Sequence, residues 1–414
     1  MLKSTKFSMS SLKKIRFSYT QMLVVFLLQV WFVNTYFRKA ESPGPEPTHP
    51  PKKDVIEPTR YFNMDEEFQK SIQSPKAPSS TIDSTQQMSD AEHKLYQHFH
   101  QKREYPVKLE PVNLKNKNLH STSNSNIHLL LIIKSSCTQE HKSRRESIRK
   151  TWGDSDYIAT ETNVKADRLF LLGNCELNHD HKKLVSEHRR FNDILQWDMV
   201  DSFWNLTVKE VGQLAYVYRK RPEVTHVFKG DDDIFVNILG IVDLIKSVDI
   251  SDRENIITGS VLSGKPVRNP KSKYFVPQWL FSDKSFPKYV QGGGFIYSKK
   301  ISDEMLWKSF EVNMFNIDDA FVGVLLEKTG RKPLLDKRFV LRNGWKNEIA
   351  EQFALEERGC YWFEILVYHK VNAKQLFDVW EIYKKLREDW TVSMERRETG
   401  YLEPKCVMLN KKFE

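Results

Sequence analysis

The sequence predicts an α/β domain built on a mostly parallel central sheet, preceded by a transmembrane helix and a disordered stem. Three observations carry this prediction. From residue 127 onward, short uninterrupted apolar runs alternate with amphipathic runs, as in parallel sheets covered on both faces. Residues 17–37 carry no formal charge, and ten of the 17 prolines fall between Pro43 and Pro111. The boundaries are a tail of residues 1–16, an anchor of 17–37, a stem of 38–125 and a globular domain of 126–414.

The N-terminus has the charge pattern of an uncleaved signal anchor. Its first 39 residues hold seven cations and no carboxylate, and five of these cations precede the uncharged span. The span of 21 residues suits the thickness of a bilayer, and the positive-inside rule places the tail in the cytosol. A cleaved signal peptide would need a small-x-small site, but Phe32, Asn34 and Tyr36 are too large for one. A buried core helix would have a polar face. The sequence therefore predicts a type II membrane protein whose main domain is lumenal.

The stem and the net charge limit the classes of partner. Residues 41–125 are rich in Ser, Thr, Gln and Lys and show no sustained apolar period, which predicts an extended tether. The net charge of +10 is concentrated at the N-terminus, because residues 40–414 hold 57 cations against 54 carboxylates. A nearly balanced lumenal domain is a poor candidate for binding nucleic acid.

The expected elements of the domain follow in order from apolar runs and amphipathic periods. Strands are predicted at 128–133, 169–172, 194–197 and 224–228, and helices at about 143–151 and 206–219. Ligands of such sheets bind at the carboxyl ends of the strands. Four cysteines, at positions 137, 175, 360 and 406, allow three full pairings between which the sequence does not choose. Asn205-Leu206-Thr207 is the only glycosylation triplet, and a lumenal location makes Asn205 a candidate acceptor.

The strongest chemical signal is an acidic triplet directly after an apolar strand, Phe228-Lys229-Gly230-Asp231-Asp232-Asp233. Residues two apart in extended backbone point the same way, so Asp231 and Asp233 can converge on one hard divalent cation. The alternative is a solvated acidic turn. Three adjacent carboxylates between apolar segments repel one another, which favours the metal site. A cation there could neutralise the phosphates of a nucleotide substrate.

Three further segments carry weaker signals. Gly292, Gly293 and Gly294 interrupt an apolar strand, which indicates either close approach of a ligand to the backbone or a flexible bulge. Asp318 and Asp319 stand where a helix should start and Gly330 where it should stop, so Asp318 is predicted as the N-cap, leaving Asp319 free to accept a proton from a sugar hydroxyl. A basic helix places two arginines on one face that could bind a polyanion, although most such runs are basic surface helices: Arg145 and Arg149.

Taken together in this order, these segments resemble the β-1,3-glycosyltransferase family of β-1,3-galactosyltransferases and β-1,3-N-acetylglucosaminyltransferases. The matching elements are RRESIRKTWG (144–153), DSFWNLTVK (201–209), FKGDDDIFVN (228–237), YVQGGGFIYS (289–298) and IDDAFVG (317–323). The resemblance implies a GT-A type nucleotide-sugar-binding fold, a Golgi membrane location, a UDP-sugar donor, Mn²⁺ and inversion at the anomeric carbon.

The resemblance also implies roles for individual residues. Asp233 with Asp231 nearby and His369 of the late segment Leu366-Val367-Tyr368-His369 correspond to metal ligands, and Asp319 to the catalytic base. The remaining site predictions are donor binding by Arg145, Arg149, Lys229 and Asp232, and sugar or acceptor binding by Gly292, Gly293, Gly294 and Asp318. The triplet Ile317-Asp318-Asp319 is similar to the N-acetylglucosaminyl subgroup, whereas galactose-transferring members usually carry Glu-Asp at that place.

The predicted function is therefore transfer of N-acetylglucosamine from UDP-GlcNAc in β-1,3 linkage onto a galactose-terminated glycan of a glycoprotein or glycolipid. A β-1,3-galactosyltransferase using UDP-Gal is the first alternative. A catalytically silent lumenal glycan-binding protein is the second, but a binder has no need of the proton acceptor that Asp319 would provide.

Overall fold

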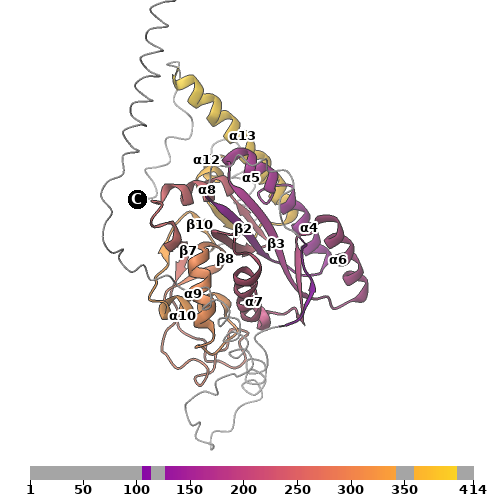
Figure 1. Ribbon diagram of the computed structural model, residues 1–414, viewed down its shortest axis with the longest axis vertical. Coiled ribbons are helices and arrows are strands. Elements are labelled where there is room, and N and C mark those ends of the chain that lie inside the picture. Colours follow the sequence, from indigo (N-terminus) through magenta and orange to yellow (C-terminus); the bar gives the residue numbers. More distant parts are fainter. Residues whose placement is uncertain (1–104, 113–125, 342–358, 399–414) are drawn as a thin grey trace, which may run out of the picture. The chain divides into compact units, whose positions relative to one another are not determined.

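The computed structural model describes residues 105–112, 126–341 and 359–398 (Figure 1). The predicted tail and anchor, at 1–16 and 17–37, and most of the predicted stem lie outside the described residues. Within the described ranges, no helix combines the length and the apolar character needed to cross a bilayer.

A twisted sheet of eight strands forms the centre of the domain, in the spatial order β1-β4-β3-β2-β5-β8-β7-β9. Six strands run in one direction, while β1 and β8 run antiparallel to their neighbours. The strands are β1 (Val107–Leu109), β2 (His128–Lys134), β3 (Lys165–Asn174), β4 (Ile194–Val200), β5 (His226–Asp231), β7 (Ile257–Leu262), β8 (Tyr289–Ser298) and β9 (Leu334–Leu335). The predicted α/β class with a mostly parallel sheet is confirmed. The direction of β8 was not predicted.

A second sheet of three short strands lies beside the first, in the order β10-β11-β6. Its members are β10 (Phe339–Val340), β11 (Val367–His369) and β6 (Ile234–Val236). Because β6 follows β5 by only two residues, this small sheet is built directly onto the carboxyl end of a central strand.

Helices cover both faces of the large sheet, and strand β2 shows why. Leu129, Leu131 and Ile133 belong to one buried cluster, whereas Leu130 and Ile132 belong to another. Alternate residues of a strand point to opposite faces, so an unbroken apolar run needs a cover on each side. The helices are α4 (Gln139–Arg149), α5 (Ser155–Thr162), α6 (Asn178–Phe191), α7 (Leu206–Lys220), α8 (Ile238–Ser247), α9 (Lys299–Ser309), α10 (Asp318–Lys328), α12 (Gly359–Glu364) and α13 (Ala373–Glu398).

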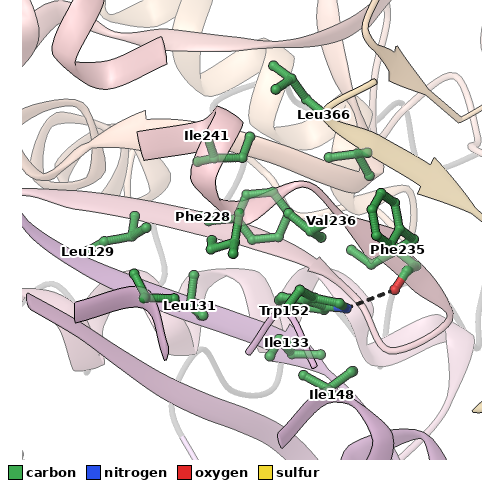
Figure 2. Packing of buried hydrophobic residues seen from close by; sticks show 14 of the residues in the cluster. Leu129, Leu131, Ile133, Ile148, Trp152, Phe228, Phe235, Val236, Ile241 and Leu366 are labelled. Atoms are coloured by element: carbon green, nitrogen blue, oxygen red, sulfur yellow. Dashed lines mark hydrogen bonds between the residues drawn. The ribbon is translucent and has the colours of Figure 1, made fainter. Parts of the chain in front are cut away.

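The cluster that contains Leu129, Leu131 and Ile133 joins aliphatic side chains of β2 to aromatic side chains of neighbouring segments. Figure 2 shows Leu129, Leu131 and Ile133 facing Phe228 and Trp152, all fully buried. Trp152 meets Phe228 edge to face, with ring centroids 6.0 Å apart. Gly153, which follows it, is required by packing, because an added Cβ would lie 2.6 Å from Cγ2 of Ile148.

Strand β1 corrects the predicted stem, which was expected to extend to residue 125. Val107 and Leu109 pair antiparallel with β4, and the amide of Asp198 donates to the carbonyl of Pro106 at 2.8 Å. Tyr105 packs against the core. The segment is short and bounded by Pro106 and Pro111, as befits an edge strand. The amino-acid composition of this segment resembles that of the predicted stem. Its pairing with β4, a strand distant in sequence, therefore cannot be predicted from the number of apolar residues within the segment.

Candidate active site

Two carboxylates and a histidine converge where the two sheets meet. Asp231 is the last residue of β5, and Asp233 directly precedes β6. β11 pairs antiparallel with β6 in a register that sets His369 opposite Ile234, and the amide of Val371 donates to the carbonyl of Asp233 at 2.8 Å. The pairing of β11 with β6 therefore brings His369 beside the acidic triplet across more than 130 residues of sequence.

This trio, called the metal-binding cluster below, has the geometry of a divalent-cation site. Its ligand atoms all lie within 4.8 Å of one another. Nε2 of His369 is 3.3 Å from Oδ1 of Asp233 and 3.8 Å from Oδ2 of Asp231. Burial alone would raise the pKa of Asp233, but the hydrogen bond and charge of His369 and the charge of Arg144 lower it overall. Two carboxylates and one imidazole fit Mn²⁺, which accepts oxygen ligands and tolerates nitrogen.

The middle carboxylate of the triplet turns away from this cluster. Asp232 is only 3% exposed. It accepts hydrogen bonds from Oγ of Ser135 and Nδ1 of His141, both at 2.6 Å, and from Arg144 at 3.2 Å. Asp232 therefore ties the triplet to the start of α4, and its carboxylate is already fully engaged within the protein.

A buried tryptophan also holds the backbone of the acidic triplet in place. The indole N–H of Trp152 donates to the carbonyl of Ile234 at 3.1 Å, as the dashed line in Figure 2 shows. Ile234 is the residue after Asp233, so this bond fixes the backbone next to the metal-binding cluster. On the other side, an added Cβ at Gly230 would lie 2.6 Å from Cδ1 of Ile234. The backbone around the triplet is thus closely packed.

The start of α10 differs from its prediction. Asp318 is the first residue of the helix, and the N-cap position belongs to Ile317, which makes no side-chain capping bond. The Asp318 carboxylate instead accepts from Nζ of Lys134 at 3.0 Å and Nζ of Lys229 at 3.4 Å. Burial opposes its ionisation, but these two lysines hold the pKa of Asp318 well below its usual range. The N-cap prediction is wrong because two buried cations bind this carboxylate.

Asp319, one residue later, has the opposite electrostatic environment. Burial and the negative charge of Asp318 raise the pKa of Asp319 to about 6, against the opposing pull of the Ala320 amide and Lys134. The Ala320 amide donates to Oδ1 at 2.8 Å. A carboxylate with this pKa is ionised at neutral pH and is a stronger base than an ordinary aspartate.

Lys134 connects the two acidic elements. Its Nζ lies 3.0 Å from Oδ1 of Asp231 and 3.0 Å from Oδ2 of Asp318. The side chain extends from the last residue of β2, at the carboxyl edge of the sheet. The metal-binding cluster and the Asp318-Asp319 pair therefore belong to one site, bridged by a single ammonium group.

The glycine segment of β8 borders this site. Between the pairs Val261–Val290 and Gly259–Phe295, one residue of β7 faces four residues of β8, numbers 291–294. The bulge predicted as one alternative is therefore present. An added Cβ at Gly292 would lie 3.5 Å from both Cβ of Asp319 and Nζ of Lys134, and one at Gly293 would lie 3.6 Å from the His369 ring. Gly294 instead meets Val367 at 2.9 Å and serves packing.

Comparison with known proteins agrees with this geometry. Residues 143–334 match the family model described as Galactosyltransferase. The chain is 34% identical over 261 residues to rat UDP-GlcNAc:betaGal beta-1,3-N-acetylglucosaminyltransferase 7, covering 62% of this chain and 64% of that protein. It is 32% identical to human N-acetyllactosaminide beta-1,3-N-acetylglucosaminyltransferase 2, covering 61% and 62%. These matches support assignment of the chain to the β-1,3-glycosyltransferase family.

Coverage extends further for another relative. Mouse N-acetyllactosaminide beta-1,3-N-acetylglucosaminyltransferase 4 is 28% identical over 307 residues, covering 74% of this chain and 82% of that protein. The chain thus spans less than two thirds of the rat and human relatives and more of the mouse one. Among solved structures, apo mouse xyloside xylosyltransferase 1 matches 59% of this chain and 97% of its own, with a TM-score of 0.31 and 10% identity.

The predicted donor-binding cations lie in buried ion pairs. Arg145 is 1% exposed and binds both oxygens of Glu187 at 2.8 Å. Arg149 binds both oxygens of Asp193 at 2.8 Å. Lys229 is fully buried against Glu210. The expected open polyanion-binding face of α4 is therefore wrong: the two arginines do share a face, but protein carboxylates occupy it.

The predicted glycosylation site is also enclosed. Asn205 is 5% exposed, and its amide nitrogen donates to the carbonyl of Val200 at 2.6 Å. Thr207 of the same triplet is fully buried and donates to the carbonyl of Phe315. In this structure the nitrogen that would carry a glycan is engaged by the backbone, and glycosylation of Asn205 stays a prediction.

Several residues of the site were not predicted from the sequence. They are Lys134, Ser135, His141 and Arg144, which surround the carboxylates described above. The position of Lys134 at the end of an apolar strand was an available signal, because such ends meet at the ligand-binding edge. One disulfide forms among the described cysteines, between Cys137 and Cys175. The side chains of Cys360 and Cys406 lie outside the described residues.

Proposed function

We propose that this protein transfers N-acetylglucosamine from UDP-GlcNAc, in β-1,3 linkage and with inversion, onto a galactose-terminated glycan. The proposal is carried by one observation: Lys134 links two acidic centres that have different environments. One is a histidine-containing cluster suited to a divalent cation, and the other is Asp319 with a raised pKa. The names of the rat and human relatives support the donor and the linkage.

The residues of the site can divide the chemistry between them. Asp319 accepts the proton of the attacking 3-hydroxyl as that oxygen forms its bond to the anomeric carbon and the bond to UDP breaks. Asp231, Asp233 and His369 would hold Mn²⁺, whose charge would stabilise the departing diphosphate. Lys134 holds Asp231 and Asp318 in place. Gly292, which has no side chain to block Asp319, leaves room for the sugars at the base.

We further propose that the protein works in the Golgi membrane, anchored by residues 17–37 with residues 126–414 in the lumen. The support is the charge asymmetry around the uncharged span. The acceptor class is a glycan of a glycoprotein or a glycolipid, and Xenopus tropicalis lactosylceramide 1,3-N-acetyl-beta-D-glucosaminyltransferase, 34% identical over 221 residues, supports the second kind of acceptor.

The test combines a donor panel with two variants. The full chain in detergent is incubated with Mn²⁺, an N-acetyllactosamine acceptor and single UDP-sugars, and UDP release is measured. Turnover is expected with UDP-GlcNAc, and turnover with UDP-Gal alone would overturn the donor. Asp319→Asn should lower kcat by roughly a hundredfold or more with UDP binding retained. Asp233→Asn should instead weaken binding of UDP with Mn²⁺ in calorimetry.

Two other outcomes would contradict parts of the proposal. Glycan binding without turnover of any donor would favour the catalytically silent alternative. Full activity in Asp319→Asn would remove this carboxylate from the mechanism, whatever the donor.

A further inference from the structure

A second pocket lies at the carboxyl ends of β3 and β4, on the same edge of the sheet as the site above. Its volume is about 790 Å³, within the usual range of small-molecule sites. The walls come from the ends of these strands, the turn after β4, the loop before β8 and the segment preceding β1. Lining residues include Tyr105, Asn174, Asp198, Ser202, Trp204 and Lys273. These define the β4-edge pocket.

The pocket combines an aromatic surface with neutral polar groups. Trp204 is 38% exposed, and its ring meets that of Phe203, which in turn meets Tyr274, in edge contacts with centroids 6.3 and 5.4 Å apart. Tyr274 is 46% exposed; it and Phe203 lie beside the pocket, whose own aromatic lining is Tyr105, Trp204 and Phe275. A large exposed aromatic surface beside hydroxyl and amide groups suits a ligand with an apolar face and a polar rim. A pyranose ring has this character.

Most charged groups at the pocket have partners within the protein, and Lys271 also lines it. Nζ of Lys108 lies 3.5 Å from Asp198 and donates to Asn174 at 3.1 Å, while the amide of Asn174 donates to Asp198 at 2.8 Å. Lys273 lies over the rings of Phe203 and Tyr274, 5.2 and 4.9 Å from their centroids. The lysines share the pocket with the carboxylate of Asp198, and its lining includes no arginine of the kind that binds phosphate at two points, so the chemistry favours a neutral ligand.

Hydrogen bonds connect the pocket walls to the segment that carries Asp318 and Asp319 and to the segment that carries Lys134. The amide of Asn316, two residues before Asp318, donates to the carbonyl of Lys273 at 2.9 Å. Just after the end of β4, Asp201 accepts from Nζ of Lys209 at 2.6 Å, and the same Nζ donates to the carbonyl of Ser135, next to Lys134, at 3.2 Å. The β4-edge pocket therefore shares its supporting segments with both acidic elements.

From this arrangement we infer that the β4-edge pocket binds an internal saccharide unit of a neutral acceptor glycan, with Trp204 as the aromatic platform. The inference rests on the proposed function, because it takes the acceptor's terminal sugar to lie at Asp319. It makes the pocket a determinant of acceptor length: a chain of several sugars reaches it, whereas a single galactoside does not.

The test uses the full chain in detergent with two acceptors, methyl β-galactoside and a tetrasaccharide of two N-acetyllactosamine units. Trp204→Ala should raise the KM of the tetrasaccharide about tenfold more than the KM of the galactoside, and Trp204→Phe should restore most of the difference. Phe377→Ala is the matched control, because Phe377 is an aromatic residue of α13 with 37% exposure that does not line the pocket. It should leave both KM values unchanged.

A binding measurement keeps the two proposals separate. Saturation-transfer NMR of the tetrasaccharide, without donor, should show contacts that Trp204→Ala removes. If the enzyme turns over and Trp204→Ala raises the KM of both acceptors equally, the role of the pocket in acceptor binding is overturned and the proposed function stands. Trp204-dependent binding without turnover would overturn the proposed function alone. A rise in the KM of the UDP-sugar in place of the tetrasaccharide would assign the pocket to the donor and overturn the inference.

Discussion

At the residue scale, two adjacent aspartates at the start of α10 acquire opposite properties from their neighbours. Lys134 and Lys229 bind Asp318 and keep it ionised, although burial works against this. That fixed negative charge, together with burial, then disfavours ionisation of Asp319 and raises its pKa to about 6. The two lysines thus influence the base through Asp318. Burial of Lys229 and the nearby charge of Lys134 lower the pKa of Lys229 to about 8.

The raised pKa of Asp319 predicts how the reaction depends on pH. A base must be deprotonated, so kcat should be near its plateau at pH 7 and fall as the pH drops through about 6. At pH 5 about one tenth of the carboxyl groups remain ionised, and kcat should fall about tenfold. The measurement is kcat between pH 4.5 and 8 at saturating donor, acceptor and Mn²⁺. A rate that stays level down to pH 4.5 would contradict this assignment.

Asp318 should contribute strongly to stability. Asp318→Asn removes the carboxylate that Lys134 and Lys229 share, while Lys134 keeps Asp231 and Lys229 keeps Glu210. The expected cost is therefore that of a lost hydrogen bond to a charged group, about 1.5–3 kcal/mol. Urea denaturation measures the change. Glu381→Gln is the control, because Glu381 is 69% exposed in its pair with Lys384 and should change stability by less than about 0.5 kcal/mol. Equal stability of the two variants would restore the simpler N-cap role.

At the element scale, the apolar runs predicted the central strands well. Strands expected at 128–133 and 194–197 appear at His128–Lys134 and Ile194–Val200. The helix expected from Ser143 begins at Gln139, because Thr138 is the N-cap. Helix α6 was missed, since its polar sequence has few apolar positions to reveal a period. Local patterns identify elements buried on both faces and fail where polar residues dominate.

In the site too, residues close in sequence could be predicted to meet, whereas residues far apart in sequence could not. Asp231 and Asp233 could be predicted because they lie two residues apart in one segment. The register of β11 against β6, which places His369 beside them, depends on pairing between distant segments and came only from a family resemblance. The buried partners of Arg145 and Arg149, Glu187 on α6 and Asp193 before β4, could not be predicted for the same reason. A cation in a sequence does not reveal whether a distant carboxylate already binds it.

The disulfide joins two loops that end neighbouring strands, after β2 and after β3. Cys137 and Cys175 are 38 residues apart, and closing a loop of this size typically stabilises a fold by about 2–4 kcal/mol. Replacing both cysteines by serine should lower the free energy of unfolding by that amount. Adding a reductant should lower the melting temperature of the wild type and have a smaller effect on the double variant. An unchanged melting temperature in the variant would contradict the bond's contribution.

At the scale of the whole molecule, the predicted anchor determines topology. The full chain should resist carbonate extraction from membranes, because residues 17–37 would lie in the bilayer. An epitope tag before residue 1 should be accessible to antibody after selective permeabilisation of the plasma membrane. Replacing the five cations that precede the span by glutamine is the control, and should reduce the fraction with a cytosolic N-terminus. A tag accessible only from the lumen would contradict the proposed orientation.

The start of the globular domain gives the last prediction, because β1 places it before residue 126. β1 pairs with β4 through Val107 and Leu109, and Asn192 exchanges two hydrogen bonds with the backbone of Val112. A fragment beginning at residue 120 loses these contacts and exposes the edge of β4, whereas one beginning at residue 100 keeps them. Unpaired strand edges also promote association between chains.

The shorter fragment should therefore melt on the order of 5 °C below the longer one, because a few kcal/mol corresponds to a shift of this size in a domain of about 300 residues. It should also aggregate more readily in light scattering at equal concentration. Tyr105→Ala in the longer fragment should lower the melting temperature by a smaller amount, since Tyr105 packs on the core while the strand pairing remains. Equal melting temperatures of the two fragments would mean that β1 contributes no stability, and would return the start of the domain to residue 126.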